Sequence, residues 1–174
     1  MTVEPDDKDW TWVLERPCPE CGFDARSIEA TTVGGRIRET ADQYVAALRR
    51  EDAMTRPSPA VWSPTEYACH VRDVHRVFAE RVRLMLGDED PLFENWDQDR
   101  TAVEERYAEQ KPAEVAEQLV QAATEAAAIY DAVLPGDWGR TGRRSNGSVF
   151  TVSSLAAYHL HDVVHHLWDV ARPR

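Results

Sequence analysis

The histidines near the C-terminal end are the residues with the clearest capacity for chemistry. Four of the six histidines, His159, His161, His165 and His166, fall within eight residues. Residues four apart on an α-helix lie about 40° apart around its axis, so His161 and His165 point in one direction. His159 and His166 lie about 140° to 160° away from His161 and are expected to face elsewhere. Imidazoles at the spacing of His161 and His165 bind a first-row divalent ion without distortion.

A third histidine, on another predicted helix, shares the inward direction. His70 lies on the apolar arc of a helix predicted over about residues 63–86, whereas His75 is about 140° away at the edge of that arc. Three imidazoles from two facing helices make a metal site that leaves positions open for water or substrate. We therefore take His70, His161 and His165 as candidate ligands. Histidines that are simply hydrogen-bonded in the core remain the alternative.

These histidines need a helical scaffold to position them. Proline and glycine breaks separate four amphipathic windows. The windows cover about residues 33–51, 63–86, 112–134 and 151–171, and an acidic connection over 87–110 holds a short helix near 102–109. The second window has the best-defined start, because Ser63 can cap it, Pro64 suits the first helical position and Glu66 completes a capping box. Strand signals are scant: Asn146–Gly147 is typical of a hairpin turn, but the segments on either side of it are short. The sequence therefore predicts an all-α four-helix bundle.

The composition restricts the partners of this bundle. The chain has 174 residues with 31 acidic and 20 basic side chains, a net charge of −11. Nucleic acid and anionic membrane surfaces are poor partners for such a chain. The sequence has no apolar run long enough to span a bilayer and starts with an acidic rather than a signal-like segment, so we expect a cytoplasmic protein. The expected partner is a small-molecule substrate, and a homodimer stays open.

Two sequence motifs resemble a known superfamily. The run from Trp62 to His70, Trp-Ser-Pro-Thr-Glu-Tyr-Ala-Cys-His, and the run from His161 to His166 resemble the second and last helices of DinB/YfiT-like four-helix bundles. The resemblance covers about residues 30–171. It implies a domain over 31–174 behind an irregular extension over 1–30, and a divalent metal, zinc or nickel.

What the resemblance implies about site and function is more specific. It makes His70, His161 and His165 the metal ligands. The superfamily includes mycothiol-dependent maleylpyruvate isomerases and bacillithiol S-transferases. We therefore expect a thiol-dependent S-transferase or isomerase that uses a low-molecular-weight thiol such as mycothiol. A metal-dependent hydrolase and a non-catalytic metal-binding or dimerising bundle are the alternatives, and no catalytic residue is assigned.

The N-terminal extension carries a second group of metal-binding residue types. Cys18 and Cys21 have the spacing of half a zinc knuckle or of a redox dithiol. A complete zinc site would have to borrow histidines or a partner chain, and a reduced loop packed across the end of the bundle is the simpler interpretation. Asp162 and Asp169 are the acidic residues placed to orient the neighbouring imidazoles, although surface charges on a helix flank are more common.

Overall fold

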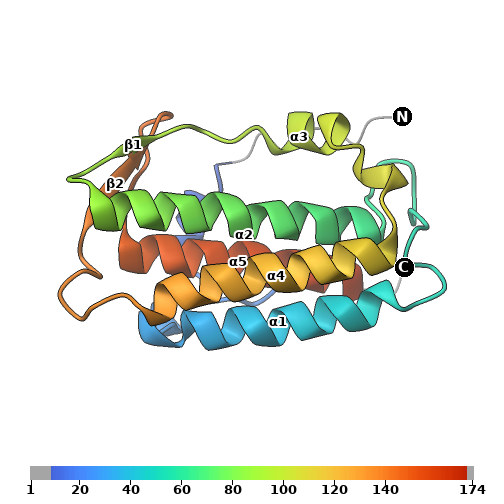
Figure 1. The fold of residues 1–174 in the computed structure, drawn as a ribbon, viewed down its shortest axis with the longest axis horizontal. Helices are drawn as coiled ribbons and strands as arrows, with labels where there is room; N and C mark the ends of the chain where they lie inside the picture. Colours follow the sequence, from blue (N-terminus) through green and yellow to red (C-terminus); the bar gives the residue numbers. More distant parts are fainter. Residues whose placement is uncertain (1–8, 172–174) are drawn as a thin grey trace.

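The computed structural model describes residues 9–171, and four long helices form its body (Figure 1). They are α1 (Val33–Leu48), α2 (Pro64–Gly87), α4 (Pro112–Asp131) and α5 (Val152–Ala171). The predicted all-α four-helix bundle is confirmed. Among the described residues, no helix combines the length and the apolar character that crossing a bilayer demands.

The helices pack as a ring in which α1 and α2 each contact both α4 and α5. Gly34, at the start of α1, lies against Ala127 and Asp131 at the end of α4, so these two helices are antiparallel. Tyr44 of α1 donates to the Val163 carbonyl of α5 over 3.0 Å, and Arg50, just after α1, donates to the Val170 carbonyl near the end of α5 over 3.2 Å, so α1 and α5 run in the same direction. In Figure 1 the chain runs from left to right in α1 and α5 and from right to left in α2 and α4, as the sequence colours show. Because α2 and α4 also run in the same direction, the chain between them has to return along the whole bundle.

This return connection packs along α2. It contains β1 (Leu92–Phe93), α3 (Gln98–Glu104) and a 3₁₀ turn (Tyr107–Glu109). Strand β1 pairs in parallel with β2 (Thr141–Arg144), which forms a hairpin with β3 (Val149–Thr151). The hairpin turn at 146–147 was predicted, whereas β1 and its pairing were not. The short helix begins at 98 rather than near 102.

The start of α2 follows the prediction closely. Ser63 Oγ accepts a bond from the Glu66 backbone N–H at 3.2 Å, while Glu66 Oε2 accepts one from the Ser63 N–H at 2.9 Å. Arg56 also binds the Glu66 carboxylate. This capping box satisfies backbone donors that a helix start otherwise leaves unpaired, and it fixes the first turns of α2, from which His70 projects.

The core contains a buried polar chain as well as apolar side chains. His75 Nδ1 lies 2.9 Å from His159 Nε2, and His159 Nδ1 lies 3.0 Å from the Tyr130 hydroxyl. All three residues are buried, and burial lowers the pKa of His75 to about 3 and that of His159 well below its usual value. Neutral imidazoles link α2, α5 and α4 here, so His75 and His159 serve the packing of the bundle.

Candidate metal centre

Two groups of metal-binding side chains lie on neighbouring faces of α5. One consists of His70, Asp162 and His166, and the other of Cys18, Cys21, His161 and His165. Within each group, one potential ligand atom per residue lies within 4.8 Å of all the others. Each group contains an i,i+4 pair from α5, and the two pairs are offset by one residue.

The first group brings α2 and α5 together. His70 Nε2 lies 3.3 Å from Asp162 Oδ1, which lies 3.8 Å from His166 Nε2. Ligands bound to one ion at 2.0–2.2 Å lie about 3.0–3.6 Å from one another, so the first distance fits a shared ion and the second is slightly long. The rings of His70 and His166 meet edge to face with centroids 4.7 Å apart. The three side chains therefore converge on one small volume.

The polar atoms of this group lack the partners that burial normally requires. Within the part of the chain described here, His70 Nδ1 is buried without a hydrogen-bond partner, and His70 Nε2 and Asp162 Oδ1 are buried facing each other at 3.3 Å without hydrogen-bond geometry. A buried polar group without a partner costs about 1–3 kcal/mol. A bound cation would satisfy these atoms, so the residues present fit a metal ion.

The protonation states of the group also suit a metal. Burial lowers the pKa of His70, opposed by the carboxylate of Asp162. Burial alone would raise the pKa of Asp162, but the His70 ring beside it, and after it the nearby imidazoles, lower that pKa below its usual value. The centre therefore presents a neutral imidazole at His70 and an ionised carboxylate at Asp162, the forms that bind metal ions.

Asp169 lies beside the ring nitrogens of His166 and His165 that face away from the two groups. His166 Nδ1 lies 3.1 Å from Asp169 Oδ2, the same oxygen that lies 3.9 Å from His165 Nε2. When His166 Nδ1 donates to this carboxylate, its Nε2 is left as the lone-pair nitrogen facing Asp162. Asp169 is thus placed to orient a ligand, one of the two roles that the sequence left open.

The structure divides the three predicted ligands between the two groups. His70 belongs to one group, and His161 and His165 belong to the other. The reason is helical: successive residues differ by 100°, so the 161/165 pair faces the N-terminal segment while the 162/166 pair faces α2. The expectation that His166 faces away from His70 is wrong. Asp162, four residues before His166, completes the pair that a search for histidines alone misses.

A cavity of about 790 Å³ opens beside the first group. Its wall includes the His161, Asp162, His165 and His166 side chains of α5. Aromatic and acidic residues complete the lining, among them Trp10, Trp62, Tyr67, Trp96, Glu20, Asp97, Asp99 and Asp169. The volume is in the range of small-molecule sites.

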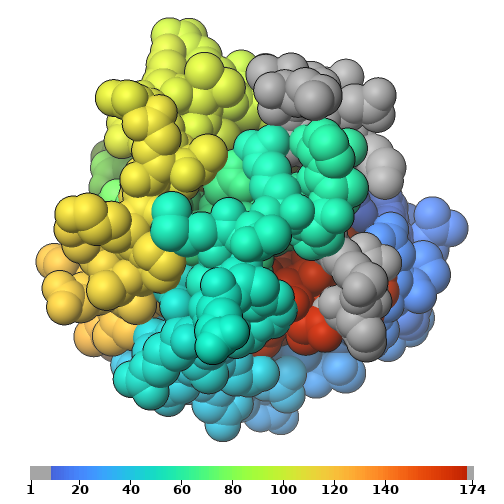
Figure 2. All heavy atoms as spheres, turned by 90° about the vertical axis from the view of Figure 1, so that its right-hand side faces the viewer, coloured from blue at the N-terminus to red at the C-terminus, as the bar shows by residue number. Residues whose placement is uncertain are grey.

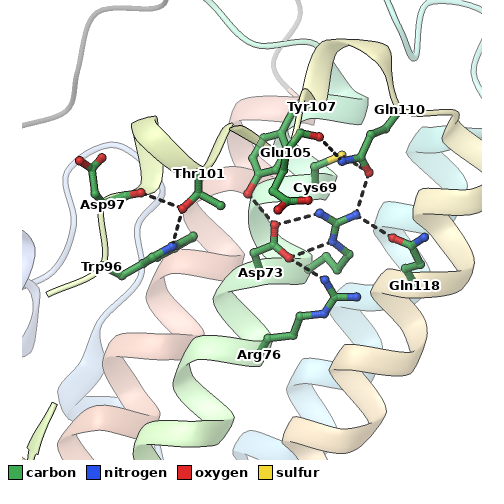
Figure 3. Close-up of polar contacts among 11 residues, drawn as sticks. Cys69, Asp73, Arg76, Trp96, Asp97, Thr101, Glu105, Tyr107, Gln110 and Gln118 are labelled. Carbon is green, nitrogen blue, oxygen red and sulfur yellow. Dashed lines mark hydrogen bonds and ion pairs between the residues drawn. The ribbon is translucent and has the colours of Figure 1, made fainter. Parts of the chain in front are cut away.

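Trp96 connects this cavity to the return connection. Its ring stacks on that of His70, with centroids 5.4 Å apart and planes 11° from parallel, and its Nε1 donates to Thr101 Oγ1 at 2.8 Å. Figure 3 shows that Thr101 in turn bonds to the Asp97 carbonyl. The first turn of α3 therefore holds the indole against a candidate ligand.

A buried ionic network anchors the far end of the same connection (Figure 3). Asp73 accepts bonds from Arg72, Arg76 and Tyr107, and Arg72 also donates to Gln110 and Gln118 at 2.7 Å each. The network joins α2 to the 3₁₀ turn and to the start of α4. It fixes the chain that follows Trp96, and the sequence analysis did not identify it.

Comparison with known protein families matches residues 35–170 to the DinB superfamily. The chain belongs to the DinB superfamily. Among solved structures, this DinB protein is similar to YfiT from Bacillus subtilis, described as a probable metal-dependent hydrolase with an unusual four-helix bundle topology. The similarity has a TM-score of 0.67 at 15% identity and covers 98% of this chain and 93% of YfiT. No curated protein sequence matches the chain.

The family match begins after the segment that carries Cys18 and Cys21. At 15% identity the likeness to YfiT concerns the fold, which shares the four-helix arrangement described above. The assignment of ligands in this DinB protein therefore rests on its own geometry.

Proposed function

We propose that this DinB protein is a divalent-metal-dependent hydrolase whose metal is held by His70, Asp162 and His166. The observation that supports this proposal is the set of buried, unpartnered atoms of His70 and Asp162 beside a cavity of about 790 Å³. Two imidazoles and one carboxylate with open positions form a donor set that suits zinc and nickel. A metal bound there would activate water and polarise the bond under attack.

The residues of the chain divide the remaining tasks. Asp169 holds His166 through Nδ1, so that its Nε2 stays directed at Asp162. Trp96 stacks on His70 and limits its rotation. Glu20, 45% exposed on the cavity wall, offers a carboxylate that can accept a proton from an incoming nucleophile.

The charge of the cavity favours hydrolysis over attack by a thiolate. Its lining holds six acidic side chains, Asp9, Glu20, Asp97, Asp99, Asp162 and Asp169, against two basic ones, Arg100 and Arg144. These side chains carry a net charge of −4, and a divalent ion would leave −2, so the wall repels an anionic nucleophile or substrate and admits water and neutral or cationic molecules. Similarity to YfiT, itself described as a probable metal-dependent hydrolase, agrees with this choice.

Thiol transfer remains the second candidate because of the cavity's size. About 790 Å³ exceeds what an attacking water needs and would accommodate a low-molecular-weight thiol such as mycothiol together with an electrophile. In this case the metal would lower the pKa of the bound thiol. Only the nucleophile differs between the two candidates.

The test combines metal analysis with two activity screens on the full chain without an affinity tag. Metal retained by the wild type should fall by one ion per chain in His166→Ala and Asp162→Ala but not in His75→Gln, which removes a buried imidazole elsewhere on α2. Chromogenic esters and amides test hydrolysis, and consumption of thiol with an alkylating electrophile tests transfer. Unchanged metal content in both alanine variants contradicts the assigned ligands, and thiol-dependent turnover without hydrolysis would favour transfer.

A further inference from the structure

The second group of side chains lies where the N-terminal segment crosses α5. Cys18 and Cys21 occupy the loop between two 3₁₀ turns, Trp10–Leu14 and Ala25–Ser27, and this loop lies against His161 and His165. Cys18, His161 and His165 are buried, with exposed fractions of 1%, 3% and 6%, and Cys21 is half-buried. Both cysteines are free thiols in the structure.

The loop has the backbone of a metal-binding knuckle. The Cys18 N–H donates to the Phe23 carbonyl at 2.8 Å, and the Gly22 N–H donates to the Cys18 carbonyl at 2.9 Å. Gly22 follows the second cysteine with a φ of 75°, a conformation that glycine adopts without strain. This tight turn brings both sulfur atoms to one side. The Phe23 N–H is also directed at the Cys21 sulfur, and it partly opposes the effect of burial, which raises the pKa of that thiol to about 11.

The spacing of Cys18 and His165 fits a tetrahedral ion. Cys18 Sγ lies 3.6 Å from His165 Nδ1. Ligands at about 2.3 Å for sulfur and 2.0–2.1 Å for nitrogen, arranged tetrahedrally, lie about 3.6 Å apart. All four potential ligand atoms lie within 4.8 Å of one another. A small contraction would therefore close the site around one ion.

The surroundings of the two imidazoles leave one ring nitrogen of each available to such an ion. His161 Nε2 is buried without a hydrogen-bond partner among residues 9–171. His165 Nε2, the nitrogen remote from Cys18, faces Glu20 and Asp169 at 3.9 Å each. Carboxylates behind a histidine in this way orient its other nitrogen toward a metal.

We propose that Cys18, Cys21, His161 and His165 form a second, closed metal site of the Cys₂His₂ type, with zinc as its ion. Four protein ligands leave no open position, so this ion is structural, unlike the one proposed at His70. The two cysteine thiolates would balance the charge of the zinc ion in the buried contact between the N-terminal segment and α5. The site fastens the N-terminal segment to α5 and holds Trp10 and Glu20 at the cavity wall.

The last part of α5 is visible at this end of the bundle, beside the loop that precedes α2 (Figure 2). Trp10 also packs on the two histidines, with ring centroids 5.7 Å from His161 and 5.0 Å from His165. The histidine pair is therefore the point at which this segment meets the bundle.

Cobalt substitution of the full chain tests the proposal directly. Cobalt bound by two thiolates and two imidazoles gives a sulfur-to-cobalt charge-transfer band, which the cysteine-free group at His70 cannot give. We expect the charge-transfer band in the wild type and its loss in Cys18→Ser and Cys21→Ser. Cys69→Ser is the matched control, because Cys69 lies on α2 and contacts Gln110. His166→Ala should keep the band while removing cobalt from the first group.

Further measurements keep the test independent of variant folding. Zinc analysis of the wild type should give one ion that survives in His166→Ala, and a chelator should release it together with a rise in the number of reactive thiols. Trypsin should then cut faster after Arg26, which is exposed and is followed by Ser27. A wild-type cobalt protein without the charge-transfer band would overturn the proposal, as would a band that persists when Cys18 and Cys21 are both serine. Reversible oxidation of the pair in protein that holds no zinc would identify a redox dithiol instead.

Discussion

Replacing Asp73 by asparagine tests how strongly the ionic network stabilises the connection beside the candidate metal centre. Asp73 is 8% exposed and its partner Arg72 is 3% exposed. The carboxylate accepts bonds from Arg72 at 3.0 and 2.8 Å, from Arg76 at 2.9 Å and from Tyr107 at 2.6 Å. Asparagine removes the charge and directs an N–H₂ group at one of these donors.

The magnitude follows from the burial of the partners. Breaking a buried ion pair costs about 3–5 kcal/mol, whereas an exposed pair is worth about 0–1 kcal/mol. Arg72 is buried but Arg76 has a 52% exposed side chain, and asparagine keeps one accepting oxygen. We therefore expect Asp73→Asn to lower the free energy of unfolding by about 2–4 kcal/mol. Glu104→Gln, which breaks the exposed pair with Arg100, should cost less than about 0.5 kcal/mol.

The pH dependence gives a second check on Asp73. Burial would raise the pKa of Asp73, but the bonds from Arg72 and Tyr107 outweigh it and lower the folded-state value below the unfolded one. The stabilisation is therefore complete above the unfolded pKa of about 3.9 and is lost as the pH falls through the folded value. Urea unfolding followed by circular dichroism should show a constant gap between wild type and variant near neutral pH that narrows in acid. A gap below about 0.5 kcal/mol at pH 7, or one that widens in acid, would refute the reasoning.

Two further predictions concern the bundle itself. Gly34→Ala should destabilise the protein by about 1–3 kcal/mol, because the new Cβ would collide with Asp131 and the Ala127 carbonyl. Gly35→Ala is the control: its Cβ has open space, so it should be neutral or stabilising by up to about 1 kcal/mol. Equal shifts of the melting temperature in the two variants would contradict this prediction. Burial lowers the pKa of His75 to about 3, whereas in the unfolded chain this histidine takes up a proton near pH 6.5. His75→Gln should therefore reduce the slope of the unfolding free energy against pH by about 1.4 kcal/mol per pH unit between about pH 4 and 6. Stability rises with pH in that window, so an unchanged slope in urea titrations would show that His75 does not contribute.

Much of the scaffold could be predicted from local sequence. The capping box at Ser63 and Glu66 and the proline at position 64 mark the start of α2 to within one residue. The predicted ends of α1 and α4 lie about three residues too late, at 51 and 134 rather than 48 and 131, because apolar spacing continues into the turns that follow. The pairing of β1 with β2 joins segments about fifty residues apart, and no local pattern encodes it.

The candidate site was predictable in its residue types but not in its grouping. Helical geometry correctly paired His161 with His165, yet it could not show that an N-terminal loop would cover this face of α5. The sequence analysis gave Asp162 the role of orienting an imidazole or of a surface charge, because carboxylates on a helix flank are more often surface groups than metal ligands. Its grouping with His70 and His166 depends on the rotation of α5 against α2, which only tertiary packing determines.

The bond from the Tyr44 hydroxyl to the Val163 carbonyl has a consequence for both sites. It attaches the middle of α5 to α1, between the residues that carry the two ligand pairs, His161 with His165 and Asp162 with His166. A helix held only by small apolar side chains can turn about its axis at little cost. A turn of about 20° would carry an imidazole nitrogen some 6 Å from the axis through about 2 Å, the length of a whole metal–nitrogen bond. Together with the bonds of His159 to His75 and Tyr130, a phenol that belongs to neither ligand set thus fixes the rotation of α5 at which both sets come into range.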